Sequence, residues 1–273
     1  MELIELIKYL ILGIVQGLTE PLPVSSSGHL VIFQFLLHME LPGLDFEIIV
    51  NAASLFAIVY YFRNDLKDLI VNNIAFVFKK QKEYQKDFNY LLLLILASIP
   101  AGIIGLLLKD TLEAYKSLLM VGIGLLLTAT TLLVVSKLRG KRVETESINV
   151  KKALWIGFAQ ALAIVPGVSR SGITTSTSLQ NKLSIDEAIK FSFLLFIPIS
   201  LASLLLSGIN IVQNPVEGMS YLGLGIAFVA SLITTYFALS IFVKVLKKQK
   251  LFLFSIYCYI VGLLSIIFHI ILL

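Results

Sequence analysis

The sequence is poor in cysteine and in charged residues. Its 273 residues include one cysteine, Cys258, so an internal disulfide and a metal site built from several thiolates are both excluded. Only 14% of the residues are charged, 58% are hydrophobic, and the mean hydropathy is +0.92. Such values are typical of membrane proteins rather than soluble ones. We therefore expect a single membrane domain over residues 1–273, with membrane lipids as partners and no binding of nucleic acid.

Long apolar segments make up most of the chain. Six of them are expected to be full transmembrane helices, at 47–62, 89–108, 118–136, 186–207, 219–243 and 251–273. Two further regions, 2–38 and 153–181, are apolar at their ends but interrupted by proline, glycine and serine. Backbone groups at membrane depth must be hydrogen-bonded or must face a polar cavity. We therefore expect these regions to be re-entrant helical hairpins in an all-α polytopic fold.

Basic residues are distributed unevenly between the expected loops. If both interrupted regions turn back, 18 lysines and arginines lie on one face of the membrane and three (Lys8, Lys109 and Lys116) on the other. If each region crosses the membrane once, the division is 13 to eight. The positive-inside rule favours the first arrangement, with the basic loops in the cytoplasm and both termini outside. A hairpin that spans the whole membrane gives the same count.

The two interrupted regions resemble each other. Aligned without a gap, residues 13–28 and 157–172 are identical at seven of sixteen positions, with an offset of 144 residues. Three expected spans follow each region, so the chain is predicted to contain pseudo-repeats at 1–136 and 150–273, joined by a basic cytoplasmic loop at 137–152. An odd number of spans inverts the second repeat relative to the first, so the hairpins would meet from opposite faces. The alternative is that small residues merely recur in membrane helices.

Serines stand directly before a helical segment in both interrupted regions. Serine is a favoured helix N-cap, and two helix N-termini aimed at one point attract an anion. Arg170 stands in the second region where Ser26 stands in the first, and its forked donors suit phosphate oxygens. We interpret the pair of regions as an anion site, with an ion pair between Arg170 and Glu20 as the structural alternative. The serines are Ser25, Ser26, Ser27, Ser169 and Ser171.

Gln16, Glu20 and His29 are further candidates for chemistry. Gln16 and Glu20 are four residues apart, and Pro21 disfavours helical geometry at Glu20. The Glu20 carboxylate could bind a divalent cation, act as a base or pair with Arg170. His29 could be a general acid or base. Because a nucleophilic serine needs a base within hydrogen-bond reach, spacing alone does not choose among the serines.

Glu47 and Asn51 lie one turn apart at the start of an expected span. An acid is favoured near a helix N-terminus for electrostatic reasons alone. A structural and a functional interpretation of these two residues therefore stay open.

Two segments resemble the signature motifs of a known family. These are "QGLTEPLPVSSSGH" at 16–29 and "PGVSRSGITT" at 166–175, and they are similar to the motifs of the bacterial undecaprenyl-diphosphatase family of bacitracin-resistance proteins. The resemblance extends to "DFEIIVNAASLFAIVYYFRNDL" and "FSFLLFIPIS", and so covers nearly the whole chain. It implies hydrolysis of undecaprenyl diphosphate to the monophosphate and inorganic phosphate, which recycles the lipid carrier of cell-wall synthesis. It also implies a bacterial plasma-membrane location, a Mg²⁺ or Ca²⁺ cofactor and an active site open to the outer side, and it leaves a homodimer open.

The resemblance also implies roles for single residues. Glu20 and Gln16 would bind or orient the metal. Ser26 would be the nucleophile or a close contact of the phosphoryl group, with His29 as base or acid. Direct attack by a water that His29 or Glu20 activates is the alternative. The diphosphate would be held by Arg170 together with Ser25, Ser27, Ser169, Ser171 and Thr174.

Two other classes share parts of this pattern. Lipid phosphatases of the phosphatidic acid phosphatase type also have Ser-Gly-His and Ser-Arg elements, but they require a second histidine soon after the arginine. Here the only later histidine is His269, in the last expected span, which excludes that class. A transporter or flippase for an anionic lipid or phosphate is the remaining alternative, because inverted repeats with broken helices are typical of transporters.

Overall fold

The computed structural model describes residues 3–39, 41, 45–114, 116–138, 147–213 and 220–272. Within these residues the chain is helical and contains no strand, as the sequence predicts. Half of the expected basic loop at 137–152, including Arg139, Lys141 and Arg142, lies outside them. The elements are α1 (Leu3–Thr19), α2 (Ser26–Leu36), α3 (Asp45–Tyr61), α4 (Arg63–Lys79), η1 (Lys82–Tyr84), α5 (Gln85–Ala114), α6 (Leu118–Leu138), α7 (Val150–Ala161), η3 (Leu162–Ile164), α8 (Arg170–Gln180), α9 (Ile185–Gln213), α10 (Tyr221–Lys247) and α11 (Leu251–Leu272).

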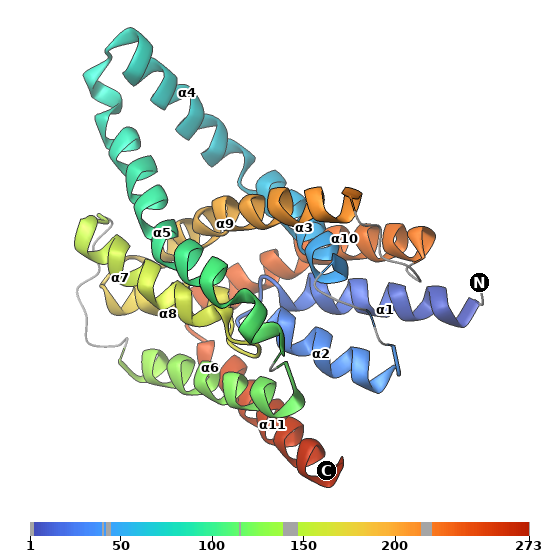
Figure 1. The fold of residues 1–273 in the computed structure, drawn as a ribbon. Coiled ribbons are helices and arrows are strands. Elements are labelled where there is room, and N and C mark those ends of the chain that lie inside the picture. Colours follow the sequence, from blue (N-terminus) through green and yellow to red (C-terminus); the bar gives the residue numbers. More distant parts are fainter. Residues whose placement is uncertain are drawn as a thin grey trace.

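Five helices have the length and apolar character of a membrane span, namely α5, α6, α9, α10 and α11. They correspond to five of the six expected spans. The sixth, expected at 47–62, is α3, which has 17 residues and meets α4 at a bend of 73°. The bend falls where the apolar run gives way to the polar sequence at 63–68, and α4 leaves the bundle there (Figure 1). The described residues thus contain five to six helices suited to a membrane.

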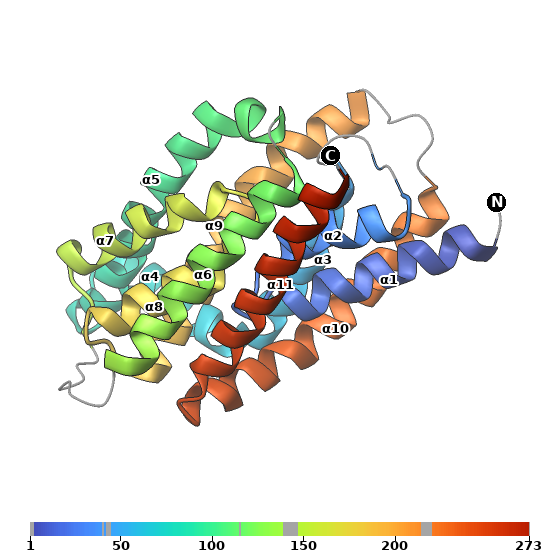
Figure 2. The same cartoon turned by 90° about the horizontal axis from the view of Figure 1, so that it is seen from below.

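The two interrupted regions each form a pair of short helices joined by a turn. α1 lies beside α2, and α7 lies beside α8, in both views of the fold (Figures 1 and 2). Pro21 and Pro23 occupy the first turn, where the missing N–H of proline breaks no helical hydrogen bond. Pro166 and Gly167 occupy the second, and Gly167 has a φ of 90°, a conformation that favours glycine.

Small residues bring the first helix of each pair against a long helix. A Cβ at Gly13 in α1 would lie 2.3 Å from the carbonyl oxygen of Ala227 in α10. A Cβ at Gly157 in α7 would lie 2.4 Å from the carbonyl oxygen of Ala97 in α5. Gly13 and Gly157 are matched positions of the two similar segments. Backbone-to-backbone packing of this kind is typical of membrane helices and holds both turns inside the bundle.

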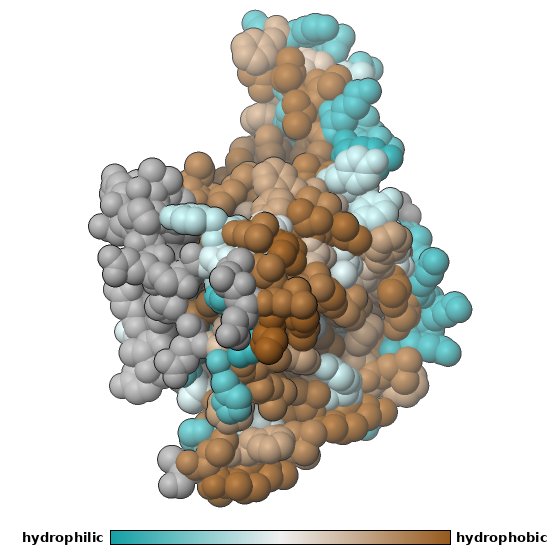
Figure 3. Space-filling view, turned by 90° about the vertical axis from the view of Figure 1, so that its right-hand side faces the viewer, coloured by the Kyte–Doolittle hydropathy of each residue, from teal (hydrophilic) through white to brown (hydrophobic). Residues whose placement is uncertain are grey.

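Apolar side chains cover much of the exterior. The outer faces of the long helices expose leucine, isoleucine and phenylalanine, for example Phe237 in α10 and Phe268 in α11. The face in Figure 3 is mostly hydrophobic, with hydrophilic residues along its margins. Acyl chains of a bilayer suit such a surface, whereas water does not. With five to six apolar helices, the chain is a multi-pass membrane protein, and some of its buried polar residues, such as Glu20, Ser25 and Ser169, lie at the two turns.

Candidate active site

A serine caps the second helix of each pair. Ser25 is the N-cap of α2, and its hydroxyl accepts a hydrogen bond from the N–H of Gly28 at 3.2 Å. Ser169 is the N-cap of α8, and its hydroxyl accepts from the N–H of Gly172 at 3.1 Å. The same three-residue spacing in both copies confirms the caps that the sequence predicts.

The two turns touch each other. The Ser171 hydroxyl, at the start of α8, donates to the carbonyl oxygen of Leu22 in the first turn at 3.1 Å. A Cβ at Gly28 would lie 3.0 Å from the Cα of Gly167 in the second turn. The N-termini of α2 and α8 therefore belong to one site, although 144 residues separate them in the sequence.

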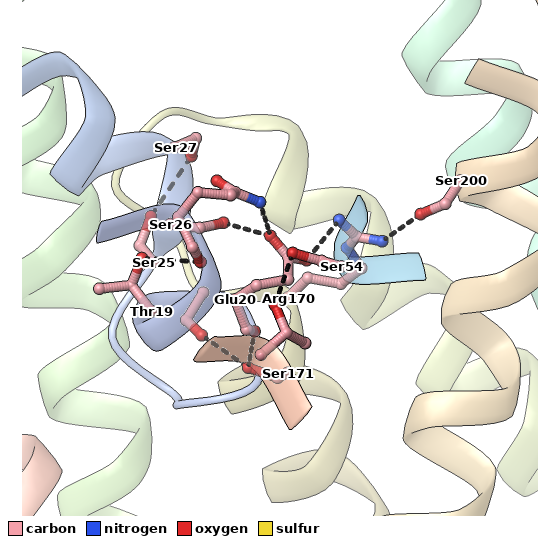
Figure 4. Close-up of polar contacts among 12 residues, drawn as sticks. Thr19, Glu20, Ser25, Ser26, Ser27, Ser54, Arg170, Ser171 and Ser200 are labelled. Carbon is pink, nitrogen blue, oxygen red and sulfur yellow. Dashed lines mark hydrogen bonds and ion pairs between the residues drawn. The ribbon is translucent and has the colours of Figure 1, made fainter. Parts of the chain in front are cut away.

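Glu20 links the two hairpins. Its Oε2 accepts hydrogen bonds from the Ser26 hydroxyl at 2.5 Å and from the Gln16 amide at 2.9 Å. Its Oε1 pairs with Nη2 of Arg170, from the other hairpin, at 3.2 Å (Figure 4). The side chains are 6% exposed for Glu20 and 24% for Arg170. A largely buried charge is costly unless it is paired, so each of the two charges stabilises the other. The ion pair weighed as the structural alternative is therefore present.

Further contacts orient the Arg170 guanidinium. Its Nη1 donates to the Ser200 hydroxyl in α9 at 3.3 Å. Its Cζ lies 4.2 Å from the ring centroid of Phe196, one turn earlier on α9, in a cation–π contact. At the base of the side chain, the Thr174 hydroxyl donates to the carbonyl oxygen of Arg170 at 2.8 Å and contacts the hydroxyl of Ser192. Ser192, Phe196 and Ser200 lie in the segment "FSFLLFIPIS" of the family resemblance, but no role was predicted for any of them.

A cavity of about 160 Å³ lies between the two turns. Both hairpins line it, together with the start of α3, so its wall combines carboxylates, hydroxyls and one guanidinium. Eight of the candidates proposed from the sequence are among its lining residues. The lining comprises Gln16, Glu20, Ser25, Ser26, Ser27, Leu30, Glu47, Asn51, Ala163, Ile164, Val168, Ser169, Arg170 and Ser171.

Two sequence candidates, His29 and Thr174, do not line this cavity. His29 is buried, with Nδ1 2.8 Å from the carbonyl oxygen of Ser25 and Nε2 2.7 Å from the hydroxyl of Tyr257 in α11. Thr174 contacts the backbone of Arg170. Both side chains thus contact the backbone of residues that line the cavity, without lining it themselves.

Glu47 and Asn51 line the cavity from α3. Their one-turn spacing and their place in the segment "DFEIIVNAASLFAIVYYFRNDL" of the family resemblance were the sequence signals for them. Lys116, which precedes α6, forms an ion pair with Glu47, and the two side chains are 19% and 16% exposed. Nothing in the sequence singled out Lys116, because a lone lysine between two spans is also what a solvated loop would contain.

The oxygen atoms at the cavity suit a hard divalent cation. Gln16, Glu20, Glu47 and Asn51 all line it, and Mg²⁺ and Ca²⁺ prefer carboxylate and amide oxygens. Within the described residues no group of three or more His, Cys, Asp or Glu side chains lies close enough together to hold a metal ion by itself. Few protein ligands fit a Mg²⁺ whose remaining positions are filled by water and by phosphate oxygens.

Known proteins resemble the chain over almost its whole length. Residues 9–264 match the family model described as bacitracin resistance protein BacA. Undecaprenyl-diphosphatase 3 of Bacillus anthracis is 44% identical over 264 residues, which cover 96% of this chain and 97% of that protein. Undecaprenyl-diphosphatase of Oceanobacillus iheyensis is 43% identical, covering 96% of each chain. Undecaprenyl-diphosphatase 1 of Bacillus licheniformis is 42% identical, covering 98% of this chain and 100% of that protein. The chain therefore belongs to the BacA family of bacitracin resistance proteins.

Proposed function

We propose that this chain is an integral membrane phosphatase that hydrolyses undecaprenyl diphosphate to undecaprenyl phosphate and inorganic phosphate. Its family and the names of its relatives support this activity. The product is the lipid carrier of cell-wall synthesis, and its recycling would confer resistance to bacitracin. The observation that carries the proposal is the Ser26–Glu20–Arg170 constellation, which holds a hydroxyl, a carboxylate and a guanidinium at one polar cavity.

In the proposed reaction the diphosphate lies between the N-termini of α2 and α8. The free N–H groups of both helix ends and the serine hydroxyls would donate to its oxygens. Arg170, which Ser200 and Phe196 already orient, would neutralise charge on the phosphoryl group in flight. The serines at the cavity are Ser25, Ser26, Ser27, Ser169 and Ser171.

Ser26 is the proposed nucleophile and Glu20 its base. The Ser26 hydroxyl donates to Oε2 of Glu20, with 2.5 Å between the two oxygen atoms. Its proton would therefore pass to the carboxylate as Oγ bonds to the terminal phosphorus. The bond from that phosphorus to the bridging oxygen breaks, and undecaprenyl phosphate leaves. Glu20 gives the proton it took from Ser26 to the leaving phosphate. Water then attacks the phosphorus of the phosphoserine and loses a proton to Glu20. The bond from phosphorus to Oγ breaks, Oγ takes that proton back from Glu20, and inorganic phosphate leaves. Direct attack by a water that Glu20 activates uses the same residues.

A divalent cation is proposed as the cofactor, with Glu20 and Gln16 as its protein ligands. It would neutralise the diphosphate when bound, and Mg²⁺ fits the small number of carboxylates better than Ca²⁺ does. Glu20 already accepts three hydrogen bonds, so binding of the cation would compete with some of them. Ca²⁺, which takes six to eight oxygen ligands, would need more of them from outside the protein.

The membrane topology is also a proposal. Six full spans, with α3 as the first, and two re-entrant hairpins in an inverted repeat agree with the paired helices and with the matched contacts of Gly13 and Gly157. Both termini would lie outside, the basic loops in the cytoplasm, and the cavity would open to the outer side of the plasma membrane. A homodimer, which the resemblance leaves open, stays untested.

Phosphate release tests the activity. Purified protein in detergent should release inorganic phosphate from undecaprenyl diphosphate when Mg²⁺ is present and should stop when a chelator is added. A transporter would bind the lipid diphosphate without cleaving it. Binding with no release of phosphate by the wild-type protein would overturn the enzymatic proposal.

A further inference from the structure

His29 uses both ring nitrogens in contacts away from the cavity. Nδ1 lies 2.8 Å from the carbonyl oxygen of Ser25, and because a carbonyl only accepts, Nδ1 carries a hydrogen. In the neutral imidazole, Nε2 is then the acceptor, and the Tyr257 hydroxyl at 2.7 Å is its donor. The two rings are nearly parallel, with 9° between their planes and 5.6 Å between their centroids.

The atom that His29 holds belongs to a strained residue. Ser25 has a φ of 69°, in the left-handed region that residues other than glycine rarely adopt. Such a conformation persists only when the surroundings enforce it. The carbonyl of Ser25 accepts from both the N–H and the Nδ1–H of His29. The contact therefore fixes the turn that presents the next residue, Ser26, to Glu20.

The neighbour of Tyr257 holds the same turn at a second point. The Cys258 thiol contacts the carbonyl oxygen of Pro23 at 3.6 Å. On α6, the Thr128 hydroxyl contacts the carbonyl oxygen of Gly167, in the other turn, at 3.3 Å. Pro23 and Gly167 are matched positions of the two similar segments. α11 therefore braces the first turn as α6 braces the second.

The Thr128 hydroxyl also accepts a hydrogen bond from the N–H of Ser169, the serine cap of α8, at 2.9 Å. At the serine cap of α2, in the first turn, different residues make the corresponding contacts. There the Ser25 carbonyl is held by His29, and His29 in turn by Tyr257. Both caps are thus tied to the third long helix of the opposite half of the chain.

We infer that Tyr257 and His29 are positioning residues for the proposed reaction, which fix the Ser25–Ser26 turn so that the Ser26 hydroxyl stays directed at Glu20. The inference rests on the proposed phosphatase function. It places the proton transfer on Glu20 and gives His29 no proton to move. It also adds Tyr257, in α11, to the residues on which the reaction depends, and no sequence pattern indicated this residue.

Replacements of His29 separate this role from that of a base. The amide nitrogen of asparagine can take the place of Nδ1 and donate to the Ser25 carbonyl, whereas glutamine reaches the position of Nε2 instead. For a positioning residue, H29N should keep activity within ~10-fold of the wild type, and H29A and H29Q should lose ~100-fold or more. For a base, neither amide could replace the imidazole, and all three variants would be equally inactive.

Tyr257→Phe provides the second arm, with Tyr259→Phe as its matched control. Tyr259 lies on the same helix and also donates or accepts one hydrogen bond, to Thr130 at 2.9 Å, but away from the site. Y257F should lower kcat by ~10-fold at a nearly unchanged KM, because it removes one hydrogen bond that the reacting turn needs. Y259F should leave kcat unchanged.

Phosphate release from undecaprenyl diphosphate by purified variants, with the melting temperature of each in detergent, is the measurement. We expect Y257F to have a lower kcat than Y259F at equal melting temperature. We also expect H29N to be more active than H29A. Equal kcat for Y257F and Y259F, or an H29N as inactive as H29A while melting like the wild type, would overturn the inference. A wild type that releases no phosphate would instead refute the proposed function, so the two failures are distinct.

Discussion

The Ser26 hydroxyl lies 2.5 Å from Oε2 of Glu20, on the far side of a carboxylate whose Oε1 pairs with Arg170. One carboxyl group therefore contacts the proposed nucleophile with one oxygen and the proposed phosphate ligand with the other. Because Glu20 and Arg170 come from different hairpins, either hairpin alone would hold an incomplete site.

Replacement of Glu20 by glutamine should remove both the base and the one carboxylate proposed to bind the cation, while keeping the shape of the side chain. We expect kcat to fall by ~100-fold to ~10,000-fold, the range associated with loss of a general base. Arg170 would also lose its counter-charge, so apparent affinity for the substrate should not fall in parallel. Steady-state phosphate release over a range of substrate concentrations separates the two effects, and a Glu20→Gln enzyme with wild-type kcat would contradict the assignment.

Arg170→Lys keeps the charge but loses the planar fork. The guanidinium now meets Glu20, Ser200 and the ring of Phe196 at once, which a single ammonium group cannot reproduce. We expect kcat/KM to fall by at least ~100-fold, with the variant still folded. Ser200→Ala, which removes only one of the three contacts, should cost far less, about 1 kcal/mol of transition-state stabilisation. Equal losses in the two variants would show that the fork itself is not used.

The Glu47–Lys116 pair predicts a dependence of KM on charge at the cavity. Lys116→Met removes the cation beside a carboxylate that lines the cavity, so the approaching diphosphate would be repelled and KM should rise several-fold. Adding Glu47→Gln should restore KM in the double variant if Glu47 acts only through its charge. A double-mutant cycle on KM measures the coupling. If the two changes were additive, the pair would have no shared effect on the substrate.

Gly124 is predicted to tolerate no side chain. A Cβ there would lie 2.3 Å from the carbonyl oxygen of Pro166, in the turn that precedes α8. Gly124→Ala should push α6 off this turn, weaken the Thr128 contacts to Gly167 and Ser169, and cost ~1–3 kcal/mol of stability together with activity. Gly102→Ala in α5 is the matched control, because nothing lies within 4 Å of its Cβ position. Melting temperature and phosphate release of both variants in detergent test this, and equal behaviour would contradict the packing described.

Much of the site could be predicted because its signals are local. Ser25 and Ser169 precede helices at cap positions, and both cap them. Arg170 is an isolated charge in an apolar segment. The two similar segments were expected to meet, and Glu20, the acid in the first segment, is its ion-pair partner. The five long apolar runs became long helices because length and hydropathy suffice to specify them.

The remainder depends on contacts between distant segments. Tyr257, Phe196 and Ser200 lie on apolar spans, where their residue types carry no signal until the helices are packed. The direction in which His29 points was likewise not predictable, because one side of α2 lines the cavity and another side contacts α11. The bend of 73° between α3 and α4 was not predicted either: α3 takes up the expected span at 47–62 almost entirely, and the polar sequence after it continues as a separate helix.

Alanine at Ser26 and at Ser27 tests the central claim most directly, because both serines line the cavity but only Ser26 donates to Glu20. The measurement is phosphate release from undecaprenyl diphosphate in Mg²⁺ by each purified variant, with melting temperature as a check of folding. Ser26→Ala should be almost inactive, whereas Ser27→Ala, which removes one proposed donor to the diphosphate, should lower kcat/KM by no more than ~10-fold. A Ser26→Ala enzyme as active as Ser27→Ala would contradict the account.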